Sequence, residues 1–318
     1  MTDVKTNVSG FFPRPPYLRE KLKSIGGLQK ESMKEETKKE IIDYVNRARN
    51  EVIKLQNKAN LDYCSEGQLL WDDLLAYPAT KINGFKMNGL IRYYNTNRFY
   101  RTPIIKNKLK LDNDFIIEDT KKAQNISNLP ITTLLPGPFT LLDLSENKYY
   151  DKSYDAINDI KKILINKITS LEDLGIETIQ IDDPSITKNF DGIKRVHRDL
   201  KDKTDLTLII NTYFGDATPI FDELNDIVDG IGLDLVNFES NWEILKNKKT
   251  PRVLKLGLFD SKNTRVERKK KVVREVENIL EFIDSEEIII STNLNLDFLP
   301  WPVMEKKIET IGLVGEEF

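Results

Sequence analysis

Two adjacent carboxylates, Asp182 and Asp183, follow the apolar segment 177–181 (ETIQI). Side chains alternate between the two faces of a strand, so only one of these carboxylates can face a site at the strand end. If the isoleucines of the segment face the covering helices, Asp182 faces inward together with Gln180. An inward carboxylate can bind a substrate ammonium group or serve as a general base, which makes Asp182 the candidate catalytic residue.

Polar residues also follow most of the other short apolar segments. They are Arg14, Glu66 and Gln68, Asn211 and Tyr213, Asp234, Asp260, and Asn293 and Asn295. Asp and Asn often cap helices or close turns, and we assign about half of the set to that role. The segment PGPFT (136–140) fixes the backbone before a helix whose first amide groups could receive an anion.

The chain contains one Cys and one His, so it cannot build a metal site from histidine and thiolate ligands. His197 falls in the helical segment GIKRVHRDLKD (192–202), which favours a helix-surface or packing role over catalysis. Cys64 ends an apolar segment and is most simply a small buried residue, with a reactive role as the alternative.

The composition is that of a globular protein with an ordinary charged surface. Of 318 residues, 39% are hydrophobic and 31% charged, and the formal net charge is −3. The basic stretch 268–271 is flanked by Glu267 and Glu275, which favours a solvated helix face over a nucleic-acid patch. The N-terminus has no secretory apolar region, and no run of about 18 apolar residues occurs. We therefore expect a cytoplasmic protein with no nucleic-acid or membrane partner.

Short β-branched segments alternate with amphipathic stretches along the chain, which is typical of βα units. The expected strands are 131–135, 177–181, 206–210, 230–236, 253–259 and 286–291, with two more around Asn7–Phe11 and Asn60–Cys64. The expected helices include about 31–59, 154–174 and 264–284. Eight such units favour a single (β/α)8 barrel over residues 1–318, rather than a doubly wound open sheet. Residues 81–105 alternate aromatic and polar residues around Gly and Asn, and predict an inserted hairpin.

Six segments together resemble the cobalamin-independent methionine synthase family. They are FFPRPPYLRE (11–20), LIRYYNTNRFY (90–100), LPGPFTLLDLS (135–145), IQIDDPSI (179–186), INTYFGD (210–216) and GLDLV (232–236). Members with two (β/α)8 barrels carry zinc and homocysteine on the C-terminal barrel, and their N-terminal barrel lacks the metal. The resemblance implies the N-terminal type of barrel for this chain, together with the segment LGLFDSKN (256–263).

The zinc barrel of this family uses a His-x-Cys, a Glu and a later Cys. This chain has Asn211 and Tyr213 at the His-x-Cys position and Asp234 near the Glu position, while the last segment offers Asn293 and Asn295. Amide and phenol side chains are poor zinc ligands. We therefore expect no cofactor on this chain and a zinc ion on a separately encoded partner barrel; metal binding between chains is left open.

In the family, the N-terminal barrel helps to hold the polyglutamate tail of methyltetrahydrofolate through an Arg-Glu-x-Lys segment and a Lys. Here the first reads Arg19-Glu20-Lys21-Leu22 and the second reads Arg92, so Leu22 departs from the pattern. Cationic side chains suit carboxylates because they form charge-assisted hydrogen bonds. Arg14, Arg19, Glu20, Lys21 and Arg92 are therefore implied donor contacts.

The resemblance also matches Asp182 to the aspartate that contacts the amino acid in the zinc barrel. Gln68 stands where that barrel has Glu, and this change weakens ammonium recognition. The preferred hypothesis is a component of methionine synthase that binds the methyl donor, is not active alone, and works with a separate zinc-bearing barrel. The alternatives are a noncatalytic scaffold barrel and a metal-free enzyme that uses Asp182, and the donor is either a folate or another methyl carrier.

Overall fold

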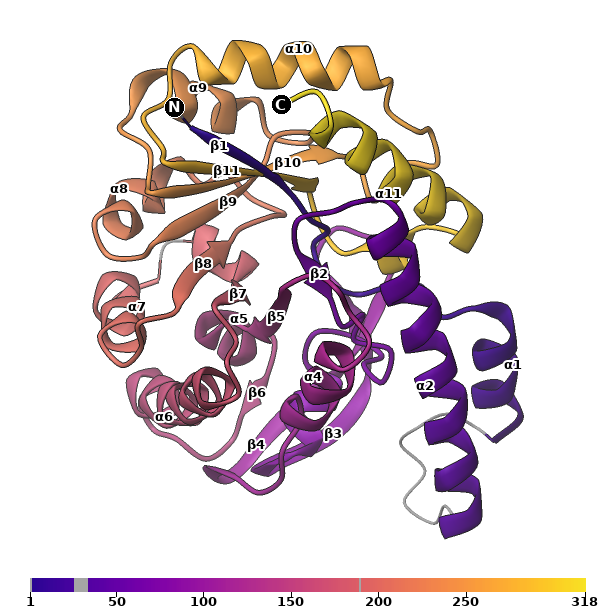
Figure 1. Cartoon of the computed structure of the whole chain (residues 1–318). Helices are drawn as coiled ribbons and strands as arrows, with labels where there is room; N and C mark the ends of the chain where they lie inside the picture. Colours follow the sequence, from indigo (N-terminus) through magenta and orange to yellow (C-terminus); the bar gives the residue numbers. More distant parts are fainter. Residues whose placement is uncertain (1, 26–33, 189) are drawn as a thin grey trace.

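The main sheet of the protein is a ring of eight parallel strands. The computed structural model describes residues 2–25, 34–188 and 190–318. The strands of the ring are β1 (Asp3–Thr6), β2 (Cys64–Ser65), β5 (Ile131–Pro136), β7 (Thr178–Asp182), β8 (Thr207–Asn211), β9 (Gly230–Asp234), β10 (Val253–Phe259) and β11 (Glu287–Thr292). Their order is β1-β11-β10-β9-β8-β7-β5-β2 (Figure 1). The backbone N–H groups of Asp62 and Tyr63 donate to the Thr6 carbonyl at 3.1 Å, which joins β1 to the segment before β2.

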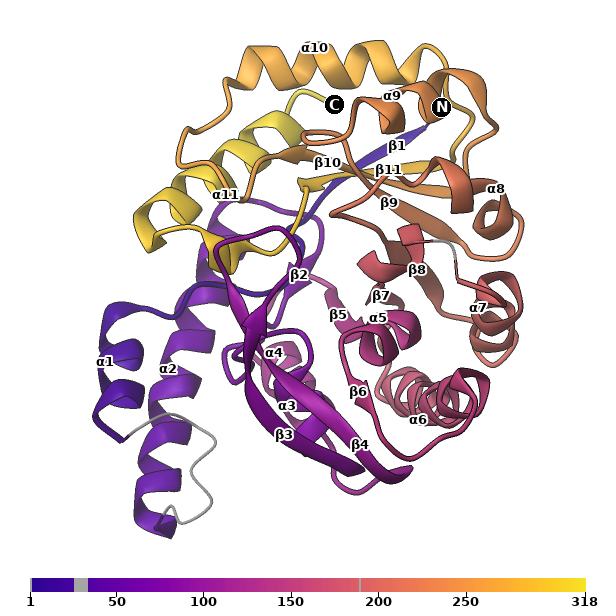
Figure 2. The ribbon, with the colours of Figure 1, turned by 180° about the vertical axis from the view of Figure 1, so that it is seen from behind.

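Most helices cover the outside of the ring, while α1 packs on α2, α3 packs on the β3–β4 hairpin and α5 packs on α6 (Figures 1 and 2). The helices are α1 (Pro16–Ile25), α2 (Glu35–Lys58), α3 (Ala76–Thr80), α4 (Ile117–Gln124), α5 (Pro138–Asp143), α6 (Ser153–Asp173), α7 (Ile193–Lys201), α8 (Thr218–Asn225), α9 (Glu239–Asn247), α10 (Lys269–Leu280) and α11 (Trp301–Gly315), with 3-10 turns η1 (Pro184–Lys188) and η2 (Leu296–Phe298). This arrangement is a (β/α)8 barrel, as the alternation of segments predicts.

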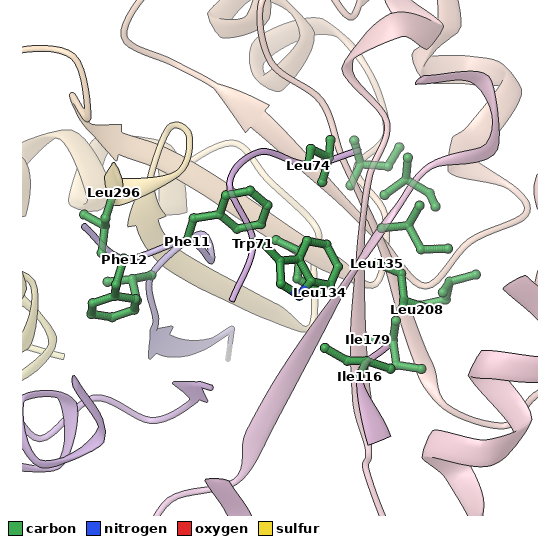
Figure 3. Packing of buried hydrophobic residues seen from close by; sticks show 14 of the residues in the cluster. Phe11, Phe12, Trp71, Leu74, Ile116, Leu134, Leu135, Ile179, Leu208 and Leu296 are labelled. Carbon is green, nitrogen blue, oxygen red and sulfur yellow. The ribbon is translucent and has the colours of Figure 1, made fainter. Parts of the chain in front are cut away.

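The core fills the layer between the sheet and the helices because the parallel strands bury both faces. Every residue of β10 is buried, and α6 buries an apolar stripe that includes Ile157, Ile160 and Leu164. Figure 3 shows part of this core, in which Leu135 of β5, Ile179 of β7 and Leu208 of β8 belong to one cluster of buried residues. A separate cluster of Ile209, Val253 and Ile289 comes from three strands of the ring.

The predicted hairpin is confirmed and is longer than the sequence suggests. Strands β3 (Ile82–Arg92) and β4 (Phe99–Leu111) pair in antiparallel fashion, with Ile82 opposite Leu111, and β6 (Glu146–Asn147) adds a short parallel strand. The hairpin lies between α3 and α4 and leaves the strand order of the barrel unchanged. The residues between β3 and β4 form a tight turn in which the Tyr93 N–H donates to the Arg98 carbonyl at 2.8 Å.

The first two strands differ from the expected positions. The strand expected at Asn7–Phe11 is wrong, because β1 is the more polar segment Asp3–Thr6, which pairs with β11. Gly10 has φ +71°, so the apolar residues after β1 lie in a turn. Asn60, where the second strand was expected to begin, also has positive φ, and β2 consists of Cys64 and Ser65 only.

Two expected helices are shorter in the structure. The helix expected over 264–284 begins at Lys269, because Glu267 accepts hydrogen bonds from the Asp260 N–H at 2.9 Å and the Lys307 ammonium at 2.8 Å. These contacts hold the preceding residues in a loop. The helix expected from about 31 begins at Glu35, and residues 31–33 lie outside the described part of the chain. Within residues 2–25, 34–188 and 190–318, no helix has the length and apolar character that a membrane crossing requires.

Candidate functional site

Asp182 lies at the C-terminal end of β7 and is fully buried inside the barrel. Its Oδ1 accepts hydrogen bonds from Gln180 Nε2 at 2.6 Å and Asn211 Nδ2 at 3.0 Å, and its Oδ2 accepts one from the Tyr213 hydroxyl at 3.0 Å. Burial raises the pKa of Asp182 to about 6, against the opposing effects of the Asn211 hydrogen bond and the nearby Lys255 charge. Three protein donors therefore hold this carboxylate in place.

Lys255 of β10 completes this network and was not found from the sequence. Its side chain is 1% exposed, its Nζ donates to Gln180 Oε1, and burial lowers its pKa to about 7. In register, Lys255 lies opposite Gly232, which lies opposite Asn211, which lies opposite Asp182. A Cβ on Gly232 would lie 2.2 Å from Asn211 Oδ1, so glycine leaves room for that amide. Polar side chains from three strands, β7, β8 and β10, thus form one layer across the barrel.

Aromatic side chains cover this polar layer at the mouth of the barrel. The Phe214 ring packs against Tyr213, Tyr93 and Tyr94 with ring centroids 4.9 to 5.7 Å apart. Tyr93 and Tyr94 come from the turn of the β3–β4 hairpin, and the Tyr94 hydroxyl lies 2.6 Å from Ser185 Oγ. The hairpin thus contributes to the cover, which leaves Asp182 with no exposed surface.

Asp234 organises a second network at the ends of β9 and β11. Its Oδ1 accepts hydrogen bonds from Asn293 Nδ2 at 3.1 Å and from the Val236 N–H at 3.0 Å, and its Oδ2 accepts one from Asn237 Nδ2 at 2.8 Å. The Oδ1 of Asn293 accepts a hydrogen bond from the Ser261 N–H at 3.0 Å. Asp234 and Asn293 therefore hold three loops together. Asp260 closes a turn by accepting a hydrogen bond from the Lys262 N–H at 2.9 Å.

Asp183 points away from Asp182 and caps helix α5. It accepts hydrogen bonds from the Thr140 N–H and hydroxyl, both at 2.7 Å. A Cβ on Gly137 would lie 2.1 Å from Asp183 Cγ, so the Pro-Gly-Pro turn needs its glycine for this close approach. The anion expected at the start of this helix is therefore the protein's own carboxylate.

His197 is a buried packing residue of α7, so the helix-surface alternative is wrong. Its Nδ1 lies 2.9 Å from the Ile193 carbonyl oxygen and its ring stacks on Phe139 at 5.7 Å. Its Nε2 lies 3.5 Å from Asp183 Oδ2. The histidine thus packs against the capped end of α5 and lies outside the polar layer around Asp182.

Glu66 faces a buried ion-pair cluster and not the barrel axis. Its Oε2 lies 3.8 Å from Arg49 Nε of α2, and Arg49 also pairs with Asp119 of α4. Burial, followed by the Asp119 charge, raises the pKa of Glu66 to about 8. Gln68 accepts a hydrogen bond from Ser65 Oγ at 3.3 Å, and its Nε2 has no partner within the part of the chain that the structure describes.

Cys64 is buried beside these groups. Burial raises the pKa of its thiol to about 12, and its Sγ donates to the Ser65 carbonyl. A thiol with a raised pKa is a poor nucleophile. Cys64 is therefore the small buried residue that the sequence suggests.

A groove of about 510 Å³ lies on the rim of the barrel mouth, beside the covered axis. It combines arginine side chains with aromatic rings. Its lining includes Arg14, Arg19, Arg98, Asp72, Asp297, Phe11, Phe12, Trp71, Phe298 and Trp301. Arg14 is held by protein acceptors, because its Nε, Nη1 and Nη2 each donate one hydrogen bond, to the Leu69 carbonyl, the Asp72 carboxylate and the Trp71 carbonyl. Arg19 of α1 is exposed and has no ion-pair partner among the described residues.

The model of the cobalamin-independent synthase N-terminal domain matches residues 81–284, which is more than half of the chain. The chain belongs to the cobalamin-independent methionine synthase family. Two relatives, both named methionine synthase, span nearly the same length. The protein from Sulfolobus acidocaldarius is 27% identical over 97% of this chain and 90% of its own. The protein from Saccharolobus solfataricus is 28% identical over 99% and 96%.

Two solved structures share the fold of this chain. The B12-independent methionine synthase from Shewanella sp. W3-18-1, in complex with selenomethionine, superimposes with a TM-score of 0.83 at 19% identity over 98% of this chain and 97% of that chain. A methyltransferase from Methanosarcina mazei gives a TM-score of 0.62 at 14% identity, over 100% and 94%. At these identities the likeness shows the barrel fold.

The strand ends of this chain do not fit the zinc ion of the family. Asn211 and Tyr213 both donate to Asp182, and an amide N–H or a phenol hydroxyl is no zinc ligand in that state. Asp234 is surrounded by amide donors. Within the described residues, no group of three or more His, Cys, Asp and Glu side chains lies close enough to hold a metal. These side chains are therefore poor ligands for zinc.

The residues implied as donor contacts do not all lie together. Arg14 and Arg19 line the rim groove, and Arg98, which the sequence did not single out, joins them. Arg92 lies on the hairpin, where it donates to the Thr96 carbonyl at 2.7 Å and to Asn97 Oδ1 at 3.3 Å.

The other residues of that segment also lie outside the groove. Lys21 pairs with Glu40 of α2 at 2.5 Å, Glu20 is exposed, and Leu22 is buried in the core. Of the segment 19–22, Arg19 alone lines the groove.

Proposed function

We propose that this chain is the donor-binding component of a methionine synthase. It holds a methyl donor of the 5-methyltetrahydrofolate type for a separately encoded, zinc-bearing barrel, which transfers the methyl group to homocysteine. The observation that carries the proposal is the rim groove, in which arginines and aromatic rings lie side by side at the open edge of the barrel mouth.

The chemistry of the groove suits a flat ring that carries carboxylates. Trp301 and Phe298 are partly exposed and offer apolar rings for stacking. Arg19 is exposed and available for a charge-assisted hydrogen bond to a glutamate carboxylate. Arg98 stacks over the Phe298 ring at 5.2 Å, which places a second guanidinium on the same wall. A polyglutamate tail presents several carboxylates, so it can use both cations.

The burial of Asp182 at the barrel axis favours a reaction that needs two chains, one for each substrate. Asp182, the residue matched to amino-acid recognition in the family, has no exposed surface and already accepts three hydrogen bonds. Homocysteine at this position would have to displace Tyr213 and the aromatic cover. A partner barrel that carries zinc would bind homocysteine as its thiolate, which is the form that attacks the methyl donor.

The same observations give less support to the two alternatives, a scaffold barrel and a metal-free enzyme. A scaffold barrel does not require an exposed arginine in a rim groove beside two partly exposed aromatic rings. A metal-free enzyme could use Asp182 and Lys255, whose pKa values of about 6 and about 7 are both shifted toward neutrality. However, neither residue has the solvent access that a substrate needs, since both are at most 1% exposed.

Direct donor binding by the isolated chain tests the proposal. We expect 5-methyltetrahydrofolate triglutamate to bind at least about tenfold more tightly than the monoglutamate at low ionic strength, with the difference shrinking as salt screens the arginines. Trp71 and Trp301 line the groove, so quenching of tryptophan fluorescence reports the binding. Equal affinity for the two forms, or no binding of either, would support the scaffold alternative.

A further inference from the structure

The charge of the chain is divided unevenly between the β3–β4 hairpin and the rest of the protein. Residues 82–111, which span the hairpin, contain seven Lys and Arg residues and no Asp or Glu. The segment therefore carries a formal charge of +7, while the rest of the chain, with 41 basic and 51 acidic residues, carries −10. The net charge of −3 averages over this division, so it does not exclude an anionic partner for the hairpin.

All seven basic side chains of the hairpin are exposed. They are Lys86, Arg92, Arg98, Arg101, Lys106, Lys108 and Lys110. Within residues 2–25, 34–188 and 190–318 none of them forms an ion pair, and the arginines donate hydrogen bonds to uncharged acceptors. Acidic residues beside the hairpin have other partners, because Glu146 of β6 pairs with Lys148 and Asp159 of α6 pairs with Lys162, both at 2.8 Å. The hairpin therefore presents positive charge that the carboxylates of the protein leave unpaired.

The basic run at the start of α10 is different. It consists of Lys269, Lys270 and Lys271, and two of these lysines are paired within the chain. Lys269 lies 2.6 Å from Glu317, and Lys271 lies 3.1 Å from Glu275. This run is therefore a partly neutralised helix face. It contains three lysines close together, so it offers a matched control for the hairpin.

The exposed surface of the hairpin also carries amides and an aromatic ring. The exposed amides are Asn83, Asn88, Asn95, Asn97 and Asn107. Phe99 is 60% exposed and Leu90 is 62% exposed. Phe99 lies opposite Arg92, and Leu90 lies opposite Arg101. Since residues two apart on a strand share a face, the ring, the leucine and both arginines lie on one face of the hairpin.

This composition is typical of a surface that binds nucleic acid. Lysine is depleted in protein–protein interfaces, whereas interfaces with nucleic acid are strongly positive. Lys, Arg and Asn side chains donate to phosphate and sugar oxygens, and an exposed aromatic ring stacks on a base of any sequence. The hairpin combines all of these features and has no carboxylate that would repel phosphates. A nucleic acid therefore fits it better than an acidic protein surface.

The packing of the hairpin favours a single strand over a duplex. Tyr100, Ile104, Ile105 and Leu109 are buried, and β4 packs on α6, so the hairpin lies against the barrel (Figures 1 and 2). A β-ribbon that enters the groove of a duplex has to project from its protein. An open surface with an exposed ring suits a single strand, whose unstacked bases are free to bind it.

The exposed positions also change along β4, from the odd-numbered Phe99 and Arg101 to the even-numbered Lys106, Lys108 and Lys110. The three lysines alternate along the strand, so their side chains form a row with a spacing of roughly 7 Å. A flexible single strand can follow this change of face, and a stiff duplex cannot. We propose that the β3–β4 hairpin binds single-stranded nucleic acid, with a base stacked on Phe99 and phosphates along the lysine row.

This inference goes beyond the proposed function and does not depend on it. Of the seven basic residues of the hairpin, Arg98 lines the rim groove, and the others lie outside its lining. The variants that test nucleic-acid binding therefore leave Arg98 in place. Donor binding to the groove should be unchanged in them.

Fluorescence anisotropy of a labelled oligouridine of about 15 nucleotides, titrated with the full chain, tests the proposal. Each phosphate contact on a single strand contributes about −0.7 to the slope of log affinity against log salt, so four to seven contacts predict a slope between about −3 and −5. The triple variant Lys106→Gln, Lys108→Gln, Lys110→Gln should make this slope shallower by about 2. Phe99→Ala should weaken binding roughly tenfold and leave the slope unchanged.

The control is the triple variant Lys269→Gln, Lys270→Gln, Lys271→Gln, which changes the net charge by the same amount. It should keep the affinity and the slope of the wild type. If the two triple variants change the slope equally, oligouridine responds to net charge and the hairpin is not its site. This comparison uses exposed or half-exposed lysines only, so both variants should fold.

The remaining outcomes identify the anion. No binding of oligouridine or oligothymidine by the wild type at low salt overturns the proposal, and so does equal affinity for a duplex of the same length. Poly-L-glutamate that binds as tightly as oligouridine, with no effect of Phe99→Ala, would indicate an acidic protein surface instead. Tighter binding of oligouridine or of oligothymidine assigns the site to RNA or to DNA. Donor binding on the same samples reports on the rim groove, so one conclusion can fail while the other stands.

Discussion

Charge reversal at Arg19 (R19E) should weaken the binding of a polyglutamated donor roughly tenfold or more, because it replaces an attraction to the tail carboxylates by a repulsion. Arg19 is exposed on α1 and lines the rim groove. Because the side chain is exposed, the charge reversal should leave folding preserved. The measurement is tryptophan quenching by the triglutamate donor, compared with the monoglutamate form. The loss should be larger for the triglutamate.

Two variants with the same change in charge serve as controls for R19E. Arg92→Glu alters a residue that the family resemblance implies as a donor contact but that lies outside the groove lining. Arg274→Glu alters an exposed residue of α10. Both should change the donor affinity much less than R19E does. If all three variants weaken binding equally, the donor responds to net charge only, and the groove is not its site.

The substitution Lys255→Met should remove a rise of stability with pH. Lys255 has an ordinary pKa of 10.5 when unfolded and about 7 in the buried layer. Between these values the unfolded state binds one more proton than the folded state, so the free energy of unfolding increases with pH. From about pH 8 to about pH 9.5, the wild type should gain about 2 kcal/mol relative to the variant. Urea unfolding at the two pH values measures this difference.

The comparison uses the slope with pH and not the absolute stability. Met cannot donate to Gln180 Oε1, so the variant should be less stable at every pH. Asp182, with a pKa raised to about 6, changes its charge mainly below this window. Parallel slopes for the two proteins would mean that Lys255 keeps its ordinary pKa, and would contradict the buried polar layer as described.

The sequence predicts most of the barrel because its parallel strands are buried on both faces and read as short β-branched segments. The strands expected at 131–135, 177–181 and 206–210 lie within one residue of β5, β7 and β8. The same reasoning fails for β1, since Asp3–Thr6 is polar and becomes a strand through its pairing with β11. A local pattern cannot reveal a strand whose stability comes from its neighbour.

The alternation of side chains predicts that Asp182 faces inward, and the hydrogen bonds to Asn211 and Tyr213 agree with this. It does not predict that both oxygens of the Asp182 carboxylate accept hydrogen bonds from protein side chains. The residue type alone does not predict that Lys255 lies inside the barrel, because lysine side chains are mostly exposed in proteins. Its even spacing from Val253, which belongs to the buried cluster with Ile209, was the signal that could have placed it inside.

Residues that depend on tertiary contacts could not be found from the sequence. Arg98 and Asp297 are almost 200 positions apart, as the separation of 199 between the two partners of their hydrogen bond shows. They meet because the hairpin turn lies against the loop after β11. Glu66 was grouped with the mouth residues, but Arg49 of α2 draws it into a separate buried cluster. The resemblance of motifs predicts neither the contact between Arg98 and Asp297 nor that between Arg49 and Glu66.

Reconstitution of methyl transfer tests the central claim most directly. The zinc-bearing barrel protein from the same source is incubated with homocysteine and 5-methyltetrahydrofolate triglutamate, with and without this chain, and methionine is measured over time. The account predicts that this chain alone forms no methionine, that it strongly accelerates formation by the zinc barrel, and that R19E reduces the acceleration. Methionine formation at the same rate with and without the chain would contradict it.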